Sequence, residues 1–263
     1  MREGYVTDTP VIPRPSAAVV LLRERPEGGI AVFMVRRHVR SEFVPDVYVF
    51  PGGSVKETDV ATERAPGLCA PDGPSGDDAT RLGAGFRAAA LRECFEEAGV
   101  LLARRNGTIL TIGTSEVERF ARYRDGLNSG TLTLRELAVS EGLTLATDEL
   151  LHWSHWVTPA AWPRRFDTHF FLAAMPHEQE AAHEGLEVTA SAWVTPEEAL
   201  ADYARGDFPL VFATERQLRA LTNLPSVAAA HAHFSSKPVS TMRPRVRRED
   251  GQDVIILPGG DEQ

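Results

Sequence analysis

Apolar residues along the chain fall into short continuous runs, which polar, glycine-rich and proline-rich segments separate. Runs of this length, bounded by turn residues, are typical of buried β-strands. The first two runs, at residues 16–22 and 30–35, flank a turn cluster at 25–29 and predict a hairpin. Further strands are predicted at the end of 43–50 and at 153–157, 169–173, 187–193 and 253–257.

Helical periodicity marks the segments between these runs. Residues 86–102 carry apolar side chains at helical spacing, and Gly99 stands near the expected helix end because glycine adopts left-handed geometry readily. Residues 115–141 also have helical character, and Ser115 followed by Glu118 resembles a capping box. Two more helices are predicted, one starting at Thr195 and one at 215–221.

The alternation of strands and helices predicts an α/β fold with a mixed sheet between helices. We expect one domain over residues 1–263. Two segments depart from the strand and helix patterns. Residues 54–82, rich in proline, glycine, aspartate and alanine, predict a loop insert, and residues 115–150 predict an added helical segment.

The formal net charge of −9 disfavours nucleic-acid and anionic-membrane partners, because both need a basic surface. No run approaches the roughly 18 apolar residues of a membrane span, and the first ten residues lack the apolar core of a signal peptide. Cys69 and Cys94 support no disulfide framework, and residues 261–263 are not a peroxisomal address. We therefore expect a cytoplasmic protein that meets anionic ligands through local arginines or a metal ion.

Three glutamates cluster on the helix predicted at 86–102. Residues three and four apart are helical neighbours, so Glu93 faces both Glu96 and Glu97. Each like-charged pair costs about 0.2–0.5 kcal/mol. One explanation is a solvated acidic face. The other is a bound hard cation such as Mg²⁺, which prefers carboxylate oxygens.

The segment Arg92-Glu93-Cys94-Phe95-Glu96-Glu97-Ala98-Gly99-Val100 resembles the second half of the Nudix box, and Phe50-Pro51-Gly52-Gly53 resembles its opening. The resemblance implies a Nudix-type α/β/α sandwich and a hydrolase that cleaves the diphosphate of a nucleoside derivative. One departure is clear: Gly53 and Arg92 are 39 positions apart, 25 more than in the usual box. The first glutamate of the box has no clear equivalent, and Glu57 and Asp59 are both candidates.

The resemblance also implies roles for individual residues. Glu93, Glu96 and Glu97, with the carbonyl of Gly53, would hold Mg²⁺ or Mn²⁺, and Arg92 would orient the acids. The general base would be Glu93, Glu184 or Glu187. We count Glu93, Arg92 and Glu187 as the catalytic candidates.

Arginines cluster directly after the strand at 30–35. Arg36, Arg37 and Arg40 could form a clamp for phosphate oxygens, for which the planar guanidinium is suited, or a solvated strand exit. We predict that these arginines bind the substrate, together with Phe50 at the end of the next strand.

Finer features resemble the peroxisomal coenzyme A diphosphatase branch of the Nudix enzymes. These features are the segments at 43–53, 95–102, 165–168, 193–200 and 257–259 and the long insert. The resemblance implies cleavage of coenzyme A or acyl-coenzyme A to 3′,5′-ADP and a phosphopantetheine. The alternatives are an ADP-sugar or dinucleoside polyphosphate hydrolase and a nucleotide-binding module without turnover. His169 stands where relatives often have arginine. Family members often dimerise, so a homodimer is a further expectation.

Overall fold

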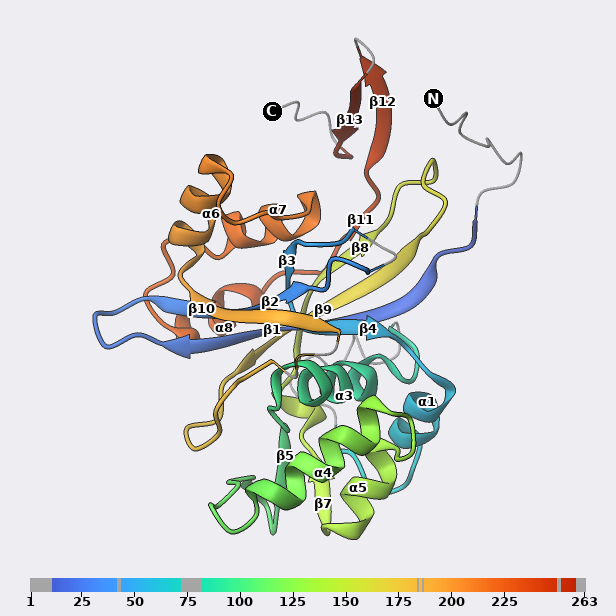
Figure 1. The fold of residues 1–263 in the computed structure, drawn as a ribbon, viewed down its shortest axis with the longest axis vertical. Coiled ribbons are helices and arrows are strands. Elements are labelled where there is room, and N and C mark those ends of the chain that lie inside the picture. The colour runs from blue at the N-terminus through green and yellow to red at the C-terminus, as the bar shows by residue number, and fades with distance from the viewer. Residues whose placement is uncertain are drawn as a thin grey trace.

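The computed structural model describes residues 11–41, 44–71, 82–183, 185, 187–249 and 252–258 of the 263-residue chain. A mixed eight-stranded sheet runs through the centre of the protein (Figure 1). Within the described ranges, no helix combines the length and apolar character needed to cross a membrane.

The sheet has the strand order β10-β2-β1-β9-β8-β11, with β3 paired to β2 and β4 paired to β1. Strands β1 and β9 are parallel, as are β8 and β11, and the remaining pairs are antiparallel. This arrangement confirms the predicted mixed sheet and the first hairpin. The strands are β1 (Arg14–Glu24), β2 (Ile30–Arg37), β3 (Tyr48–Val49), β4 (Gly52–Ser54), β8 (Leu151–Val157), β9 (Phe166–Ala174), β10 (Val188–Val194) and β11 (Thr241–Met242).

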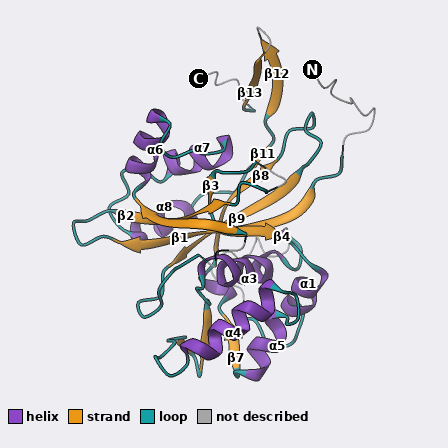
Figure 2. Ribbon diagram, in the orientation of Figure 1, coloured by secondary structure: helices purple, strands orange, loops and turns teal. Residues whose placement is uncertain are grey.

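Helices cover both faces of the sheet, so the layers are helix, sheet and helix (Figure 2). The lower layer of the view contains α1 (Glu57–Glu63), α3 (Phe86–Ala98), α4 (Val117–Asn128) and α5 (Leu134–Ser140). The other layer contains α6 (Pro196–Arg205), α7 (Phe212–Ala220) and α8 (Val227–Ser235). The first of these, α6, begins as predicted, with Thr195 capping the backbone N–H of Glu198. Helix α8 is not anticipated by the sequence pattern.

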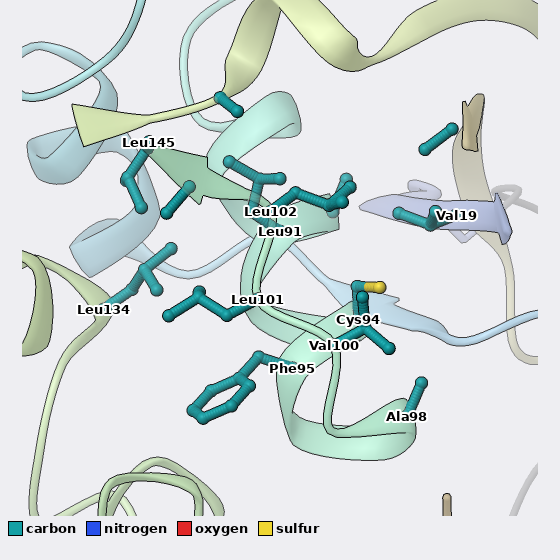
Figure 3. Close-up of a cluster of buried hydrophobic side chains, with 14 of the residues drawn as sticks. Val19, Leu91, Cys94, Phe95, Ala98, Val100, Leu101, Leu102, Leu134 and Leu145 are labelled. Carbon is teal, nitrogen blue, oxygen red and sulfur yellow. The ribbon is translucent and has the colours of Figure 1, made fainter. Parts of the chain in front are cut away.

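Two hydrophobic cores lie on the two faces of β1, because successive side chains of a strand point to opposite faces. Ala17, Val19 and Leu21 pack toward α3, whereas Ala18, Val20 and Leu22 belong to the core beneath α6, α7 and α8. Around α3, buried side chains surround the helix on several sides (Figure 3). The helix that carries the glutamate cluster is thus fixed rigidly against the sheet.

Glycines set both ends of α3. Gly85 precedes the helix with φ of 99° and Gly99 follows it with φ of 72°, a conformation that favours glycine. The prediction that the helix extends to residue 102 is therefore four residues too long. After Gly99 the chain leaves the helix, and Val100, Leu101 and Leu102 are buried in the same core.

The two segments singled out in the sequence contain regular structure. Residues 54–82 include α1, and residues 72–81 lie outside the described ranges. Residues 115–150 form α4, α5, β7 (Leu143–Leu145) and the 3₁₀-helix η1 (Thr147–Glu149). The capping box predicted at Ser115 is wrong, because Glu116 precedes α4, whereas Thr133 and Glu136 form such a box at α5.

Two small sheets complete the fold. Strand β7 pairs with β5 (Ala103–Arg105), which also pairs with β6 (Thr108–Ile109), and β7 packs against α5. Strands β12 (Arg245–Glu249) and β13 (Gln252–Ile256) form a hairpin that projects beyond the main sheet (Figure 1).

Candidate active site

The acid trio, Glu93, Glu96 and Glu97, lies where α3 passes the short strand β4. Glu93 and Glu96 are buried, and Glu97 is partly exposed. The backbone N–H of Gly52 donates a hydrogen bond to Glu97 Oε2 at 2.9 Å. A Cβ atom at Gly53 would lie 2.4 Å from Glu93 Oε1, so any larger residue would displace the Glu93 carboxylate from this position.

Arg92 connects the acids to α1. Its Nε and Nη2 donate to Asp59 Oδ1 and Oδ2 at 2.9 and 3.0 Å, in the paired geometry that suits a guanidinium. Its Nη1 donates to Glu93 Oε1 and Glu96 Oε2, both at 2.6 Å. Burial lowers the pKa of Arg92, but its bonds with Asp59 and the charges of the acids outweigh burial and raise the pKa overall. Arg92 therefore stays charged and holds the two glutamates in fixed orientations.

Asp59 takes the position beside Arg92 for which the sequence left two candidates. It is almost fully buried, and besides Arg92 it accepts the backbone N–H of Lys56 at 2.8 Å. The other candidate, Glu57, is exposed on the same helix. Asp59 follows Gly53 by six positions, which is where the usual spacing of the box would put its first glutamate, so the extra residues come after this aspartate.

The electrostatics of the acid trio favour a bound cation. The pKa of each acid is raised, and burial is the largest cause. The pKa of Glu93 is raised to about 7. Among the described residues, Glu96 Oε1 has no hydrogen-bond partner, and Lys56 Nζ lies 3.7 Å from it. Buried carboxylates with a free oxygen are the donor set of a hard divalent ion, so the acid trio fits Mg²⁺ or Mn²⁺.

A cavity of about 750 Å³ opens in front of the acid trio. All three acids line it, as do Gly53, Arg37 and Arg40. Burial lowers the pKa of Arg37, and the charges of Glu97, Glu187 and Glu93 oppose this effect, which places the guanidinium in the field of the acids. The lining of the cavity therefore combines carboxylates with arginines, the groups that a metal-bound diphosphate needs.

Another part of the cavity wall is aromatic. Its residues come from β8, β9, α7 and the loop between β8 and β9, and they are Trp156, Trp162, Phe166, Phe170 and Phe212. Trp156 and Phe212 meet edge to face, with centroids 6.3 Å apart. No local pattern reveals this wall, because its members lie far apart in the sequence.

Only some of the remaining predicted site residues that the structure describes line the cavity. Phe50 and Glu187 line the cavity, whereas Glu184 lies outside the described residues. Arg36 is not among the described residues that line the cavity, and its Nε pairs with Asp46 Oδ1 at 2.8 Å. The predicted substrate contact of Arg36 therefore has no support from this arrangement, because successive side chains of β2 point to opposite faces. The carbonyl of Gly53 accepts the hydroxyl of Ser16 at 2.7 Å, a contact that the sequence did not reveal.

Comparisons with known proteins point to one family. The NUDT19 Nudix domain family matches residues 62–213, more than half of the chain. Putative nudix hydrolase 7 of Caenorhabditis elegans is 29% identical over 179 residues, which cover 68% of this chain and 51% of that protein. Human acyl-coenzyme A diphosphatase NUDT19 is 27% identical over 255 residues, 83% of this chain and 67% of that protein. The chain thus spans about half the length of the worm protein.

A solved structure extends the likeness to the fold. The crystal structure of a Nudix hydrolase from Alicyclobacillus acidocaldarius has a TM-score of 0.71 and 30% identity, and the match covers 86% of this chain and 99% of that one. Together with the family match, this shows that the chain belongs to the Nudix hydrolases, in the NUDT19 Nudix domain family.

Proposed function

We propose that this protein is a metal-dependent diphosphatase that cleaves coenzyme A or acyl-coenzyme A to 3′,5′-ADP and phosphopantetheine or its acyl ester. One observation carries the proposal: the acid trio and two arginines share one cavity with an aromatic wall. The name of the human relative, acyl-coenzyme A diphosphatase, points to the same substrate class.

Hydrogen bonds hold each acid of the trio in place. Arg92 donates to Glu93 Oε1 and Glu96 Oε2, so Glu93 Oε2 and Glu96 Oε1 remain for an ion. The backbone N–H of Gly52 donates to Glu97. A bound Mg²⁺ or Mn²⁺ would neutralise the diphosphate and lower the pKa of a coordinated water. Arg37 and Arg40 would orient the phosphate oxygens, so that most of the rate enhancement comes from positioning and electrostatics.

We assign the general base to Glu187 rather than to Glu93. Glu187 is exposed in the cavity wall and lies in the field of Arg37, whereas Arg92 already binds one oxygen of Glu93. One oxygen of Glu93 accepts from Arg92 and the other would bind the ion, so neither could take a proton from water, whereas Glu187 lines the same cavity as the acid trio. On this assignment, Glu187→Gln lowers kcat and keeps metal affinity, whereas Glu93→Gln weakens metal binding. The opposite result would move the base to Glu93.

The aromatic wall suits the remainder of such a substrate. Adenine can stack on indole and phenyl rings, and the pantetheine arm with its acyl chain needs apolar surface. Trp156, Trp162 and Phe212 provide this surface in the same cavity as the acids. An ADP-sugar would leave part of this wall without an apolar partner. A dinucleoside polyphosphate would place a second nucleobase on it.

A substrate panel tests the proposal. The protein is incubated with coenzyme A, short- and long-chain acyl-coenzyme A, an ADP-sugar and a dinucleoside polyphosphate, each with Mg²⁺ or Mn²⁺, and products are identified by mass. We expect 3′,5′-ADP from the coenzyme A compounds. Turnover of the other compounds without 3′,5′-ADP formation would replace the substrate assignment, and binding without any turnover would favour a nucleotide-binding module.

The proposal also covers the domain organisation, the compartment and the oligomeric state of the protein. The two cores packed on one sheet support a single domain over residues 1–263. Neither Cys69 nor Cys94 forms a disulfide bond, as is usual in proteins of a reducing compartment such as the cytoplasm. Light scattering after size exclusion tests the expected homodimer.

A further inference from the structure

Two histidines and an aspartate lie on the face of the sheet opposite the aromatic wall. Thr168 and Phe170 of β9 line the cavity, and Asp167 and His169 alternate with them, so they point to the other face. There His169 contacts the ring of Phe86 at the start of α3, with centroids 4.5 Å apart. The proposed diphosphate chemistry uses none of these side chains.

Three potential ligand atoms converge at this place. His155 Nε2 contacts Asp167 Oδ1, and His169 Nε2 lies 3.9 Å from the same oxygen. All ligand atoms of the group lie within 4.8 Å of one another. Neighbouring ligands of a tetrahedral Zn²⁺ ion are separated by about 3.4 Å, given bonds of about 2.0–2.2 Å. Small side-chain shifts therefore suffice to enclose an ion.

We propose that His155, Asp167 and His169 bind a divalent first-row transition-metal ion of the Zn²⁺ type, at a second site separate from the acid trio. Imidazole nitrogen suits Zn²⁺ and Co²⁺, whereas Mg²⁺ prefers oxygen ligands alone. The two sites thus differ in donor chemistry, and different ions can occupy them.

The opposite nitrogen of each imidazole already has a partner. His155 Nδ1 lies 2.9 Å from Thr241 Oγ1, and His169 Nδ1 lies 2.9 Å from His152 Nε2. Histidines that ligate a metal usually donate their other N–H to such a partner, which fixes the tautomer and the ring orientation. In the ion-bound state, with Nδ1 protonated on both rings, each Nε2 would present its lone pair to the ion, which takes the place of the proton in the hydrogen bond between His155 and Asp167.

The site has room for adjustment and for a fourth ligand. The rings of His155 and His169 stack with centroids 3.8 Å apart and an interplanar angle of 17°, so a small tilt of each ring that keeps its Nδ1 contact would aim its Nε2 at the ion. The Asp167 side chain is 35% exposed, which lets a water complete the coordination. An ion here would join β8 to β9 and, through Thr241, would steady β11, which leads to Pro244 in the cavity wall.

Titration of the tag-free, chelator-treated protein with Co²⁺ tests the site. Tetrahedral Co²⁺ with imidazole ligands absorbs visible light far more strongly than octahedral Co²⁺ on oxygen ligands. We expect one equivalent of Co²⁺ to produce the strong absorption and to raise the Tm. His155→Ala should weaken binding by roughly 100-fold or more, and Thr241→Val by about 10–100-fold, as for other partners of metal ligands.

Two control variants separate this site from other metal binding. Glu97→Gln alters the acid trio, and His183→Ala removes a histidine that bonds to Ser191 outside the group, so both should retain the wild-type titration. If His155→Ala fails to fold, Asp167→Asn replaces it, because it preserves side-chain shape. The proposal is overturned if the wild type gives no strong absorption, if the absorption survives in the folded ligand variant, or if Glu97→Gln abolishes it.

Discussion

Replacing Asp59 by asparagine should disorganise the acid trio without touching any of its members. Asp59 accepts three hydrogen bonds, two from Arg92 and one from the backbone N–H of Lys56. Asparagine has one carbonyl oxygen, so its amide N–H groups would face donors, and Arg92 would lose one of its three carboxylate partners. Removing one partner of a buried ion pair lowers the free energy of unfolding by about 3–5 kcal/mol.

Such a loss corresponds to a fall in Tm of roughly 6–20 °C for a chain of this size. Because Arg92 orients Glu93 and Glu96, the metal-dependent rate should also fall by about 10–100-fold. Thermal unfolding and initial rates with saturating Mg²⁺ measure the two effects. Glu57→Gln is the matched control, since Glu57 is exposed on the same helix, and it should change stability by less than about 0.5 kcal/mol. Equal stability and equal rates for the two variants would refute the reasoning.

Three further predictions follow from the geometry of the acid trio. Glu96→Gln should lower the metal-dependent rate by at least about 10–100-fold, and an unchanged rate would remove Glu96 from the metal site. Gly53→Ala should abolish most activity, because its Cβ would lie 2.4 Å from Glu93 Oε1, whereas Gly113→Ala, whose Cβ meets nothing closer than 3.8 Å, should retain it. Burial raises the pKa of Glu93 from 4.5 to about 7, so its contribution to metal-free stability is complete below pH 4.5 and is lost as the pH rises through 7. Relative to Glu93→Gln, the chelator-treated wild type should lose about 3 kcal/mol between pH 4.5 and pH 8, and a constant difference would contradict this.

Local sequence patterns predicted the elements that carry the chemistry. The strands at β1, β2, β8, β9 and β10 and the helix α3 appear where continuous apolar runs and helical spacing indicate them. These patterns succeed because each element buries a face whose period is visible within ten residues. The end of α3 was misplaced, since the apolar residues after Gly99 continue the core without continuing the helix.

Features that depend on tertiary contact were harder to predict. Asp59 could not be chosen over Glu57 from the sequence, because only the fold brings α1 beside Arg92. The aromatic wall combines residues of β8, β9 and α7, which share no spacing. Arg36 and Arg37 are adjacent in sequence, yet the pleat of β2 sends only Arg37 into the cavity.

Anomalous diffraction from crystals containing Mn²⁺ tests the central claim most directly. The account predicts a peak among the carboxylates of Glu93, Glu96 and Glu97, close to the carbonyl of Gly53. At Mn²⁺ concentrations that support turnover, a map without a peak at these oxygens would contradict it.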